Sequence, residues 1–209
     1  MQRLKEIDAA RGIGIILVVL GHCIRGFSKT QDPVLKMIDV FIYTFHMPII
    51  FFISGILSAK VLKLNNSERF NYIKTRFIRL IVPYFAASFI WLPFILLLST
   101  FANSPYNLKA LPLIFIGESP NGSLWFLYSL FVIQMFVALF ANEKNLTLII
   151  FLSAVILSSF EATGLNLHGI SEAFIRIPFF ILGLWFSLNY RKDLTPPYRL
   201  NYLLYLQRL

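Results

Sequence analysis

The chain has 209 residues, of which 57% are hydrophobic and only 14% are charged, and it contains 22 phenylalanines. A soluble domain carries about 25% charged residues and has no core large enough for so many aromatic rings. This composition excludes a soluble enzyme and a disordered chain, and the single cysteine, Cys23, excludes a disulfide scaffold. It predicts an integral protein of the lipid bilayer.

The formal net charge of +9 raises the question of nucleic-acid binding. The basic residues, however, come in short groups between long apolar runs, as they do in cytoplasmic loops. They do not line one polar face, as a nucleic-acid footprint would require. The charge pattern therefore favours a membrane topology and predicts no nucleic-acid partner.

The predicted fold is all-α, a polytopic membrane helix bundle, because a bilayer core needs about 20 mostly apolar residues per helix. The apolar runs are continuous and lack the alternation, over about ten residues, of a membrane barrel strand. The six predicted transmembrane helices are residues 8–27, 39–59, 80–100, 123–142, 146–165 and 173–190.

The Lys and Arg residues predict the orientation of these helices. With the N-terminus inside, 14 of the 19 basic residues fall on the inner side, so both termini are expected to be cytoplasmic. Residues 1–190 form the predicted transmembrane domain, and residues 191–209 a cytoplasmic charged linker with a short amphipathic tail. Residues 101–122 are rich in Pro and Gly and predict an ordered outer loop or a re-entrant segment.

The first predicted helix contains ionisable residues, which cost about 3 kcal/mol each at the centre of a spanning helix. Arg11 and His22 are eleven residues apart. Eleven steps of about 100° return nearly to the same face, with an axial rise of about 16.5 Å. Either the pair lines a channel from the cytoplasmic side, or His22 is a buried histidine bonded to a neighbouring helix. Cys23 is expected to be a small buried residue and not a nucleophile.

Five segments, in order, resemble the acyltransferase-3 family of membrane acyltransferases, and most closely its fucose 4-O-acetylase-like branch. The first, IDAARGIGIILVVLGH, contains the Arg11-x10-His22 spacing. The others are YTFHMPIIFFISGIL (43–57), KTRFIRLIVPYF (74–85), SLWFLYSLF (123–131) and IPFFILGLWF (177–186). Ser123 stands where relatives often have histidine. The family's helices continue beyond the six predicted here, so the resemblance implies a chain shortened at its C-terminus.

The resemblance implies a multi-pass enzyme of the bacterial inner membrane. It would move an acyl group, usually acetyl, from cytoplasmic acyl-CoA to a hydroxyl of an extracytoplasmic sugar or polysaccharide. His22 would be the catalytic general base, and Arg11, Arg76 and Arg79 would bind the acyl donor. Arg76 and Arg79 also satisfy the positive-inside rule, which is the alternative explanation for them. Acetyl-CoA is expected as a cosubstrate, with no bound cofactor, and the scattered histidines predict no metal site.

Further residues are candidates for the cavity or the acceptor side. They are His46, Glu118, Trp125 and Glu161. Pro48 is expected to break the second helix locally, so that His46 either lines the cavity or satisfies a freed carbonyl. The pair Ser54-Gly55 is expected to permit close packing against another helix, as small residues do in membranes.

Two of these candidates, Trp125 and Glu161, have a structural alternative. Trp125 is expected either to stack against a sugar or to belong to an aromatic belt. Glu161 or Glu172 is expected to form an interhelical ion pair with Arg176, near the outer ends of the last two helices. Glu118, in the outer loop, is a further residue on the side from which an acceptor would approach.

Two functions other than an active enzyme remain open from the sequence. A shortened, non-catalytic relative would share every motif with the enzyme. A small transporter component would use Arg11, His22 and Arg176 along a solute path. A transporter of that kind predicts related halves with discontinuous helices, and residues 1–100 and 101–209 show no such symmetry.

Overall fold

The computed structural model describes residues 5–27, 32–97, 108–120, 122–164 and 167–190, and all regular structure in these ranges is helical. The helices are α1 (Lys5–Phe27), α2 (Pro33–Ser58), η1 (Ala59–Lys63), α3 (Asn66–Arg76), η2 (Phe77–Ile81), α4 (Val82–Leu97), η3 (Leu108–Ile116), α5 (Trp125–Phe140), α6 (Leu146–Thr163) and α7 (His168–Tyr190). Within the described ranges, five helical segments are long and apolar enough to cross a membrane, and α5 is a shorter apolar helix. The predicted all-α membrane bundle is confirmed.

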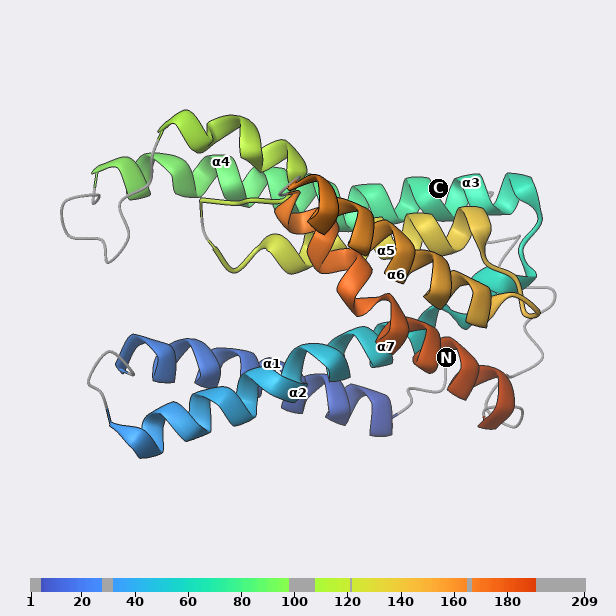
Figure 1. The fold of residues 1–209 in the computed structure, drawn as a ribbon, viewed down its shortest axis with the longest axis horizontal. Coiled ribbons are helices and arrows are strands. Elements are labelled where there is room, and N and C mark those ends of the chain that lie inside the picture. The colour runs from blue at the N-terminus through green and yellow to red at the C-terminus, as the bar shows by residue number, and fades with distance from the viewer. Residues whose placement is uncertain (1–4, 28–31, 98–107, 121, 165–166, 191–209) are drawn as a thin grey trace.

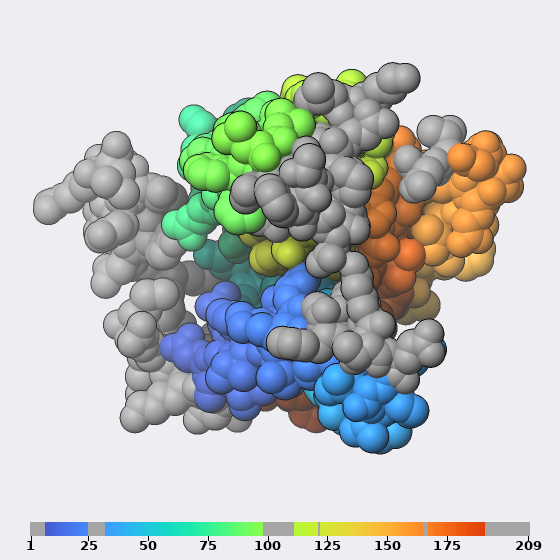
Figure 2. Space-filling view, turned by 90° about the vertical axis from the view of Figure 1, so that its left-hand side faces the viewer, coloured from blue at the N-terminus to red at the C-terminus, as the bar shows by residue number. Residues whose placement is uncertain are grey.

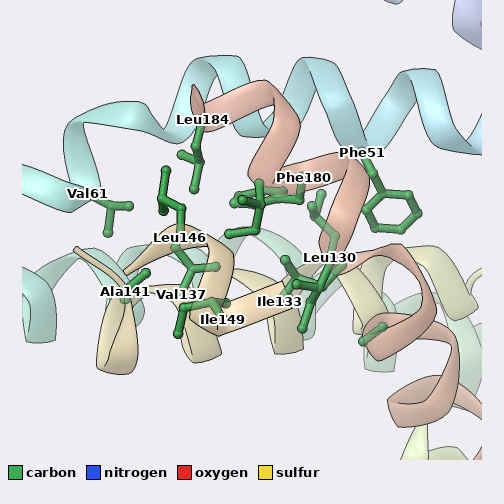
Figure 3. Close-up of a cluster of buried hydrophobic side chains, with 14 of the residues drawn as sticks. Phe51, Val61, Leu130, Ile133, Val137, Ala141, Leu146, Ile149, Phe180 and Leu184 are labelled. Carbon is green, nitrogen blue, oxygen red and sulfur yellow. The ribbon is translucent and has the colours of Figure 1, made fainter. Parts of the chain in front are cut away.

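Figure 1 shows two groups of helices, with α1 and α2 side by side in one group and α3 to α6 in the other. Helix α7 runs diagonally between the groups and packs most extensively against α2, then against α5 and α6. Buried side chains from these four helices form the core shown in Figure 3, and Phe51, Ile133, Val137, Phe180 and Leu184 are almost fully buried in it. Helix α1 lies outside this core and packs mainly along α2.

The crossing of α2 and α7 depends on two glycines. A Cβ atom at Gly55 would collide with the carbonyl oxygen of Phe180, and one at Gly183 would collide with the carbonyl oxygen of Phe52. The two backbones are therefore in direct contact, as small residues permit in membrane bundles. The close packing predicted for Gly55 is confirmed.

The helical segment that contains the third predicted span begins at Asn66, fourteen residues before the predicted first residue, 80. Its first part, α3, is too polar to be found by an apolar window, but it carries a capping box. The Asn65 side chain accepts from the Glu68 N–H at 3.0 Å, and the Glu68 carboxylate accepts from the Asn65 N–H at 2.9 Å. These bonds satisfy orphan donors and start the helix outside the apolar run.

A π-helical turn, η2, joins α3 to α4 and contains Arg79. Pro83 has no N–H to donate to the carbonyl of Arg79, four residues earlier. The turn widens instead, and the N–H of Val82 donates to the carbonyl of Phe77, five residues earlier. Turns of this kind occur frequently at functional sites.

Residues 98–100 of the third predicted span, 80–100, lie outside the described residues.

Helix α2 also starts earlier than its predicted first residue, 39. The Asp32 side chain accepts from the Val34 N–H at 2.8 Å, and Pro33 occupies the first helical position. Both features favour a helix start. The helix then continues through Pro48 without interruption, so the predicted local break is wrong.

The short helix α5 is held at its inner end by Arg69. The guanidinium of Arg69 donates to the carbonyls of Ala138 at 2.6 Å and Ala141 at 3.1 Å, and its Nε donates to Leu64 at 3.1 Å. These bonds satisfy carbonyls that have no partner within the helix. With 16 residues, α5 is about 24 Å long, less than the roughly 30 Å of a bilayer core.

Residues 108–120 form an ordered segment between α4 and α5, as predicted. Tyr84 and Tyr128 donate to the carbonyls of Ile114 at 2.8 Å and Phe115 at 2.9 Å. Gly117 has a φ of 93° and lies so close to Gly169 that a Cβ would come within 2.7 Å of that residue's Cα. Residues 101–107 and 121 of the predicted loop lie outside the described residues. The bonds from Tyr84 and Tyr128 tie this segment to α4 and α5.

Candidate active site

The site begins with the face of α1 that carries Arg11 and His22. Helix α1 is unbroken from Lys5 to Phe27, so the eleven-residue spacing places both side chains on one face. Both are exposed within the protein. Gly14 and Gly21 are buried against side chains of α2, and the Arg11–His22 face lies about 60° to 100° around the helix from them.

His22 reaches from α1 to the start of α5. Its Nε2 lies 3.3 Å from the Oγ of Ser123, a residue 101 positions later in the chain. Its ring also meets the ring of Tyr43, on α2, edge to face with centroids 6.4 Å apart. The predicted catalytic residue is therefore placed where three helical segments meet, and not on a face directed only at lipid.

His46 belongs to the same group of side chains. Its ring is edge to face with that of Tyr43 at 4.8 Å, and it is buried. Its Nδ1 lies 2.7 Å from the carbonyl oxygen of Ile42, which only accepts, so Nδ1 carries the proton. The carbonyl that Pro48 frees is that of Thr44, four residues earlier. The expectation that His46 bonds a carbonyl freed by Pro48 is therefore wrong.

Trp125 links this group to α7. The guanidinium carbon of Arg176 lies 4.5 Å from the centroid of the indole ring, a cation–π contact. Arg176 is ion-paired with Glu172 of the same helix and donates to the Glu172 carbonyl at 3.0 Å. The predicted interhelical pair is thus an intrahelical one. Because one face of Trp125 is covered by Arg176, only the other face or the edge of the indole is available to a ligand.

The two other acceptor-side candidates are not joined to this group by any side-chain bond among the described residues. Glu161 is exposed near the outer end of α6. Glu118 is partly buried in the ordered outer segment, next to Ser119, whose hydroxyl lies 2.9 Å from that of Ser88. Their predicted acceptor-side role stays a prediction.

The predicted donor-binding arginines occupy both groups of helices. Arg11 lies on α1, and Arg76 and Arg79 lie where α3 passes through the π turn into α4. The Arg76 guanidinium lies 4.8 Å above the ring of Tyr72, and its Nε is buried without a hydrogen-bond partner. Arg79 is exposed. Figure 2 looks onto the opposite end of these helices, where α1 and α4 end, and shows a recess between them.

A separate hollow of about 520 Å³ lies at the inner end of the bundle. It is lined by residues of η1 and of the turn between α5 and α6: Leu62, Lys63, Asn142, Glu143 and Lys144. Lys63 and Glu143 form an ion pair across it at 3.7 Å. These residues follow the ends of α2 and α5, so the hollow is at the opposite end of α5 from Ser123.

A family model described as an acyltransferase domain matches residues 4–206. The chain belongs to the acyltransferase-3 family. It is also similar to nodulation protein NolL of Mesorhizobium japonicum, with 24% identity over 185 residues that cover 87% of this chain and 47% of that protein. The chain thus spans about half the length of this curated relative. No solved structure matches the chain.

Three features of this site do not follow from the local sequence. The signal for Ser123 in the sequence is its departure from the histidine that family members often have at this position. Tyr43 is an ordinary aromatic residue in an apolar run. The stacking of Arg176 on Trp125 joins residues 51 positions apart and follows from the packing of α7 on α5.

Proposed function

We propose that this protein is a membrane-bound O-acyltransferase that moves an acetyl group from cytoplasmic acetyl-CoA to a hydroxyl of an extracytoplasmic sugar or polysaccharide. The observation that carries the proposal is the placement of His22. His22 lies on the α1 face that also carries Arg11, and its Nε2 is 3.3 Å from the hydroxyl oxygen of Ser123. A base within hydrogen-bond reach of a hydroxyl is what acyl transfer to an alcohol requires.

The donor would enter from the cytoplasmic side. Arg11 lies about 16 Å along α1 from His22, and Arg76 and Arg79 lie on the facing group of helices. Guanidinium groups bind phosphate through paired hydrogen bonds, so these residues suit the nucleotide end of acetyl-CoA. The pantetheine arm would extend along the α1 face and bring the thioester to His22.

The acceptor would enter from the opposite side. His22 lies near the outer end of α1 and close to the start of α5, beside the ordered outer segment. His22 would remove the proton of the acceptor hydroxyl as that oxygen attacks the acetyl carbonyl, and would return the proton to the thiolate of CoA. Both termini would be cytoplasmic in a bacterial inner membrane, as the distribution of Lys and Arg predicts.

The direct test is transfer of radiolabelled acetyl from acetyl-CoA in membranes that contain this chain. Incorporation of label into membrane or surface glycan is expected, and membranes without the chain provide the baseline. Label that stays in acetyl-CoA and free acetate would contradict the proposal for this chain. It would favour the non-catalytic relative, because that alternative has the same motifs and lacks only the activity.

Arg79→Ala is expected to raise the KM for acetyl-CoA by about 10-fold to 150-fold and to change kcat little. A charge-assisted bond to phosphate contributes about 1.5–3 kcal/mol, and the phosphates are remote from the reacting carbonyl. Steady-state kinetics with varied acetyl-CoA measure the change. Lys144→Ala, which removes an exposed basic residue at the inner hollow, is the matched control and should leave KM unchanged. Equal KM values in the wild type and Arg79→Ala would remove Arg79 from the donor site.

A further inference from the structure

Ser123 lies at an unusual place in the chain. It occupies the turn directly before α5, and Leu124 is the N-cap residue of that helix. A serine next to a helix start commonly accepts from the first backbone N–H groups, yet α5 has no side-chain cap. The Ser123 hydroxyl instead lies 3.3 Å from Nε2 of His22, on a helix far away in the sequence.

This contact bears on the proposed role of His22. A general base acts on the hydroxyl that lies within hydrogen-bond reach of it. In this structure that hydroxyl belongs to the protein itself, at 3.3 Å from Nε2. Direct attack by a sugar would require the sugar hydroxyl to take the place of Ser123. Attack by Ser123 requires no such displacement.

We propose that Ser123 is a catalytic nucleophile that carries the acyl group as a serine ester between donor and acceptor. The proposal rests on the proposed function and adds a covalent step to it. A serine hydroxyl is a weak nucleophile by itself and is activated by an adjacent histidine, which is the arrangement seen here.

The two half-reactions balance without a further reactant. In the first, the Ser123 Oγ–H bond breaks, its proton moves to Nε2 of His22, and Oγ bonds to the thioester carbonyl carbon. The C–S bond then breaks, and the CoA thiolate takes the proton from His22 and leaves as free thiol. In the second, the acceptor hydroxyl gives its proton to Nε2 and attacks the ester carbonyl. The Ser123 oxygen leaves and recovers the proton.

The surroundings of Ser123 favour these steps. The first-turn N–H groups of α5 point toward the end of the helix where Ser123 lies. That of Leu127 donates to the Leu124 carbonyl at 3.1 Å, and the Leu124 side chain has no acceptor for the others. The positive end of the helix dipole stabilises negative charge at this position, including charge that develops on an attacked carbonyl oxygen. The covalent step also lets CoA leave toward the inner side before the acceptor enters from the outer side.

The test is isotope exchange between labelled free CoA and acetyl-CoA, with no acceptor present, in detergent-solubilised full-length protein. An acyl-serine enzyme catalyses this exchange through its first half-reaction alone. The wild type is expected to exchange label. Ser123→Ala is expected to exchange it at least about 1,000-fold more slowly, as enzymes that lack a catalytic serine do. Ser158→Ala, an exposed serine on α6, is the matched control and should exchange at the wild-type rate.

A second measurement follows the covalent intermediate. Protein incubated with labelled acetyl-CoA and denatured should retain label on the peptide that contains Ser123. Ser123→Cys should hold the label as a thioester, which neutral hydroxylamine cleaves, whereas the wild-type ester requires alkaline hydroxylamine. Label that persists in Ser123→Ala would overturn the proposal.

The two proposals fail in different ways. Transfer of acetyl to glycan by a wild-type protein that neither exchanges CoA nor retains label would overturn the acyl-serine and leave the proposed function intact. Exchange and label without any transfer to glycan would support the acyl-serine and overturn the sugar acceptor. Absence of exchange and of label in the wild type overturns the acyl-serine whatever the rate of transfer.

Discussion

His22→Ala is expected to lower acetyl transfer by about 100-fold to 10,000-fold, the range that a positioned general base contributes. The loss should appear in kcat, because His22 acts on the reacting hydroxyl and is far from the cations proposed to bind the donor. His22 is exposed, and truncating an exposed side chain usually changes stability by less than about 0.5 kcal/mol. A folding defect would therefore not account for such a loss. Transfer of labelled acetyl at matched expression measures the effect.

The neighbouring residue provides the control for this prediction. Cys23 is exposed and free of any disulfide, so the expectation that it is buried is wrong. Cys23→Ala changes the same turn of α1 on a different face and should retain wild-type transfer. If His22→Ala and Cys23→Ala transfer acetyl equally well, His22 is not the base. If both variants lose activity, the outer end of α1 contributes through its packing.

The sequence predicts the transmembrane helices where their residues are apolar and misses the parts that are not. Lipid-facing and core-facing residues of α6 are both hydrophobic, so an apolar window finds it, although residue 165 of the predicted span lies outside the described residues. Helix α3 is polar and extends the third segment beyond the apolar run, and its capping residues Asn65 and Glu68 mark its start. Local capping signals, and not hydropathy, define where such helices begin.

Helical periodicity predicts half of the candidate site. The spacing of Arg11 and His22 requires only that α1 be a continuous helix, which it is. The bond from His22 to Ser123 joins residues 101 positions apart and depends on how α5 is held against α7. No local pattern encodes that distance, because it is fixed by the packing of segments that are far apart in the chain.

Pro48 shows why a rule about one residue type fails inside a packed helix. Proline removes one N–H and would be expected to interrupt α2. Here the flanking turns are buried between α1 and α7, and the backbone groups of those turns have no water to bond if the helix opens. The helix therefore continues, and the buried His46 ring bonds the carbonyl of Ile42 within it.

The contact between α2 and α7 gives the largest expected effect on folding. Gly183→Ala places a Cβ on the carbonyl oxygen of Phe52 and 2.9 Å from the Ile56 nitrogen. These are backbone atoms, so the two helices must move apart to relieve the collision. Overpacking of this kind costs about 1–3 kcal/mol, and sometimes more. The midpoint of thermal unfolding in detergent should fall by about 2 to 12 °C.

The same substitution should lower acetyl transfer, because α7 also carries Arg176, which stacks on Trp125 two residues after Ser123. A shift of α7 away from α2 would move the start of α5 relative to His22. Gly12→Ala is the matched control, since a Cβ at Gly12 has no neighbour within 4 Å. It should raise stability slightly, by up to about 1 kcal/mol from helix propensity. An unfolding midpoint of Gly183→Ala equal to that of the wild type would contradict the backbone contact on which this site depends.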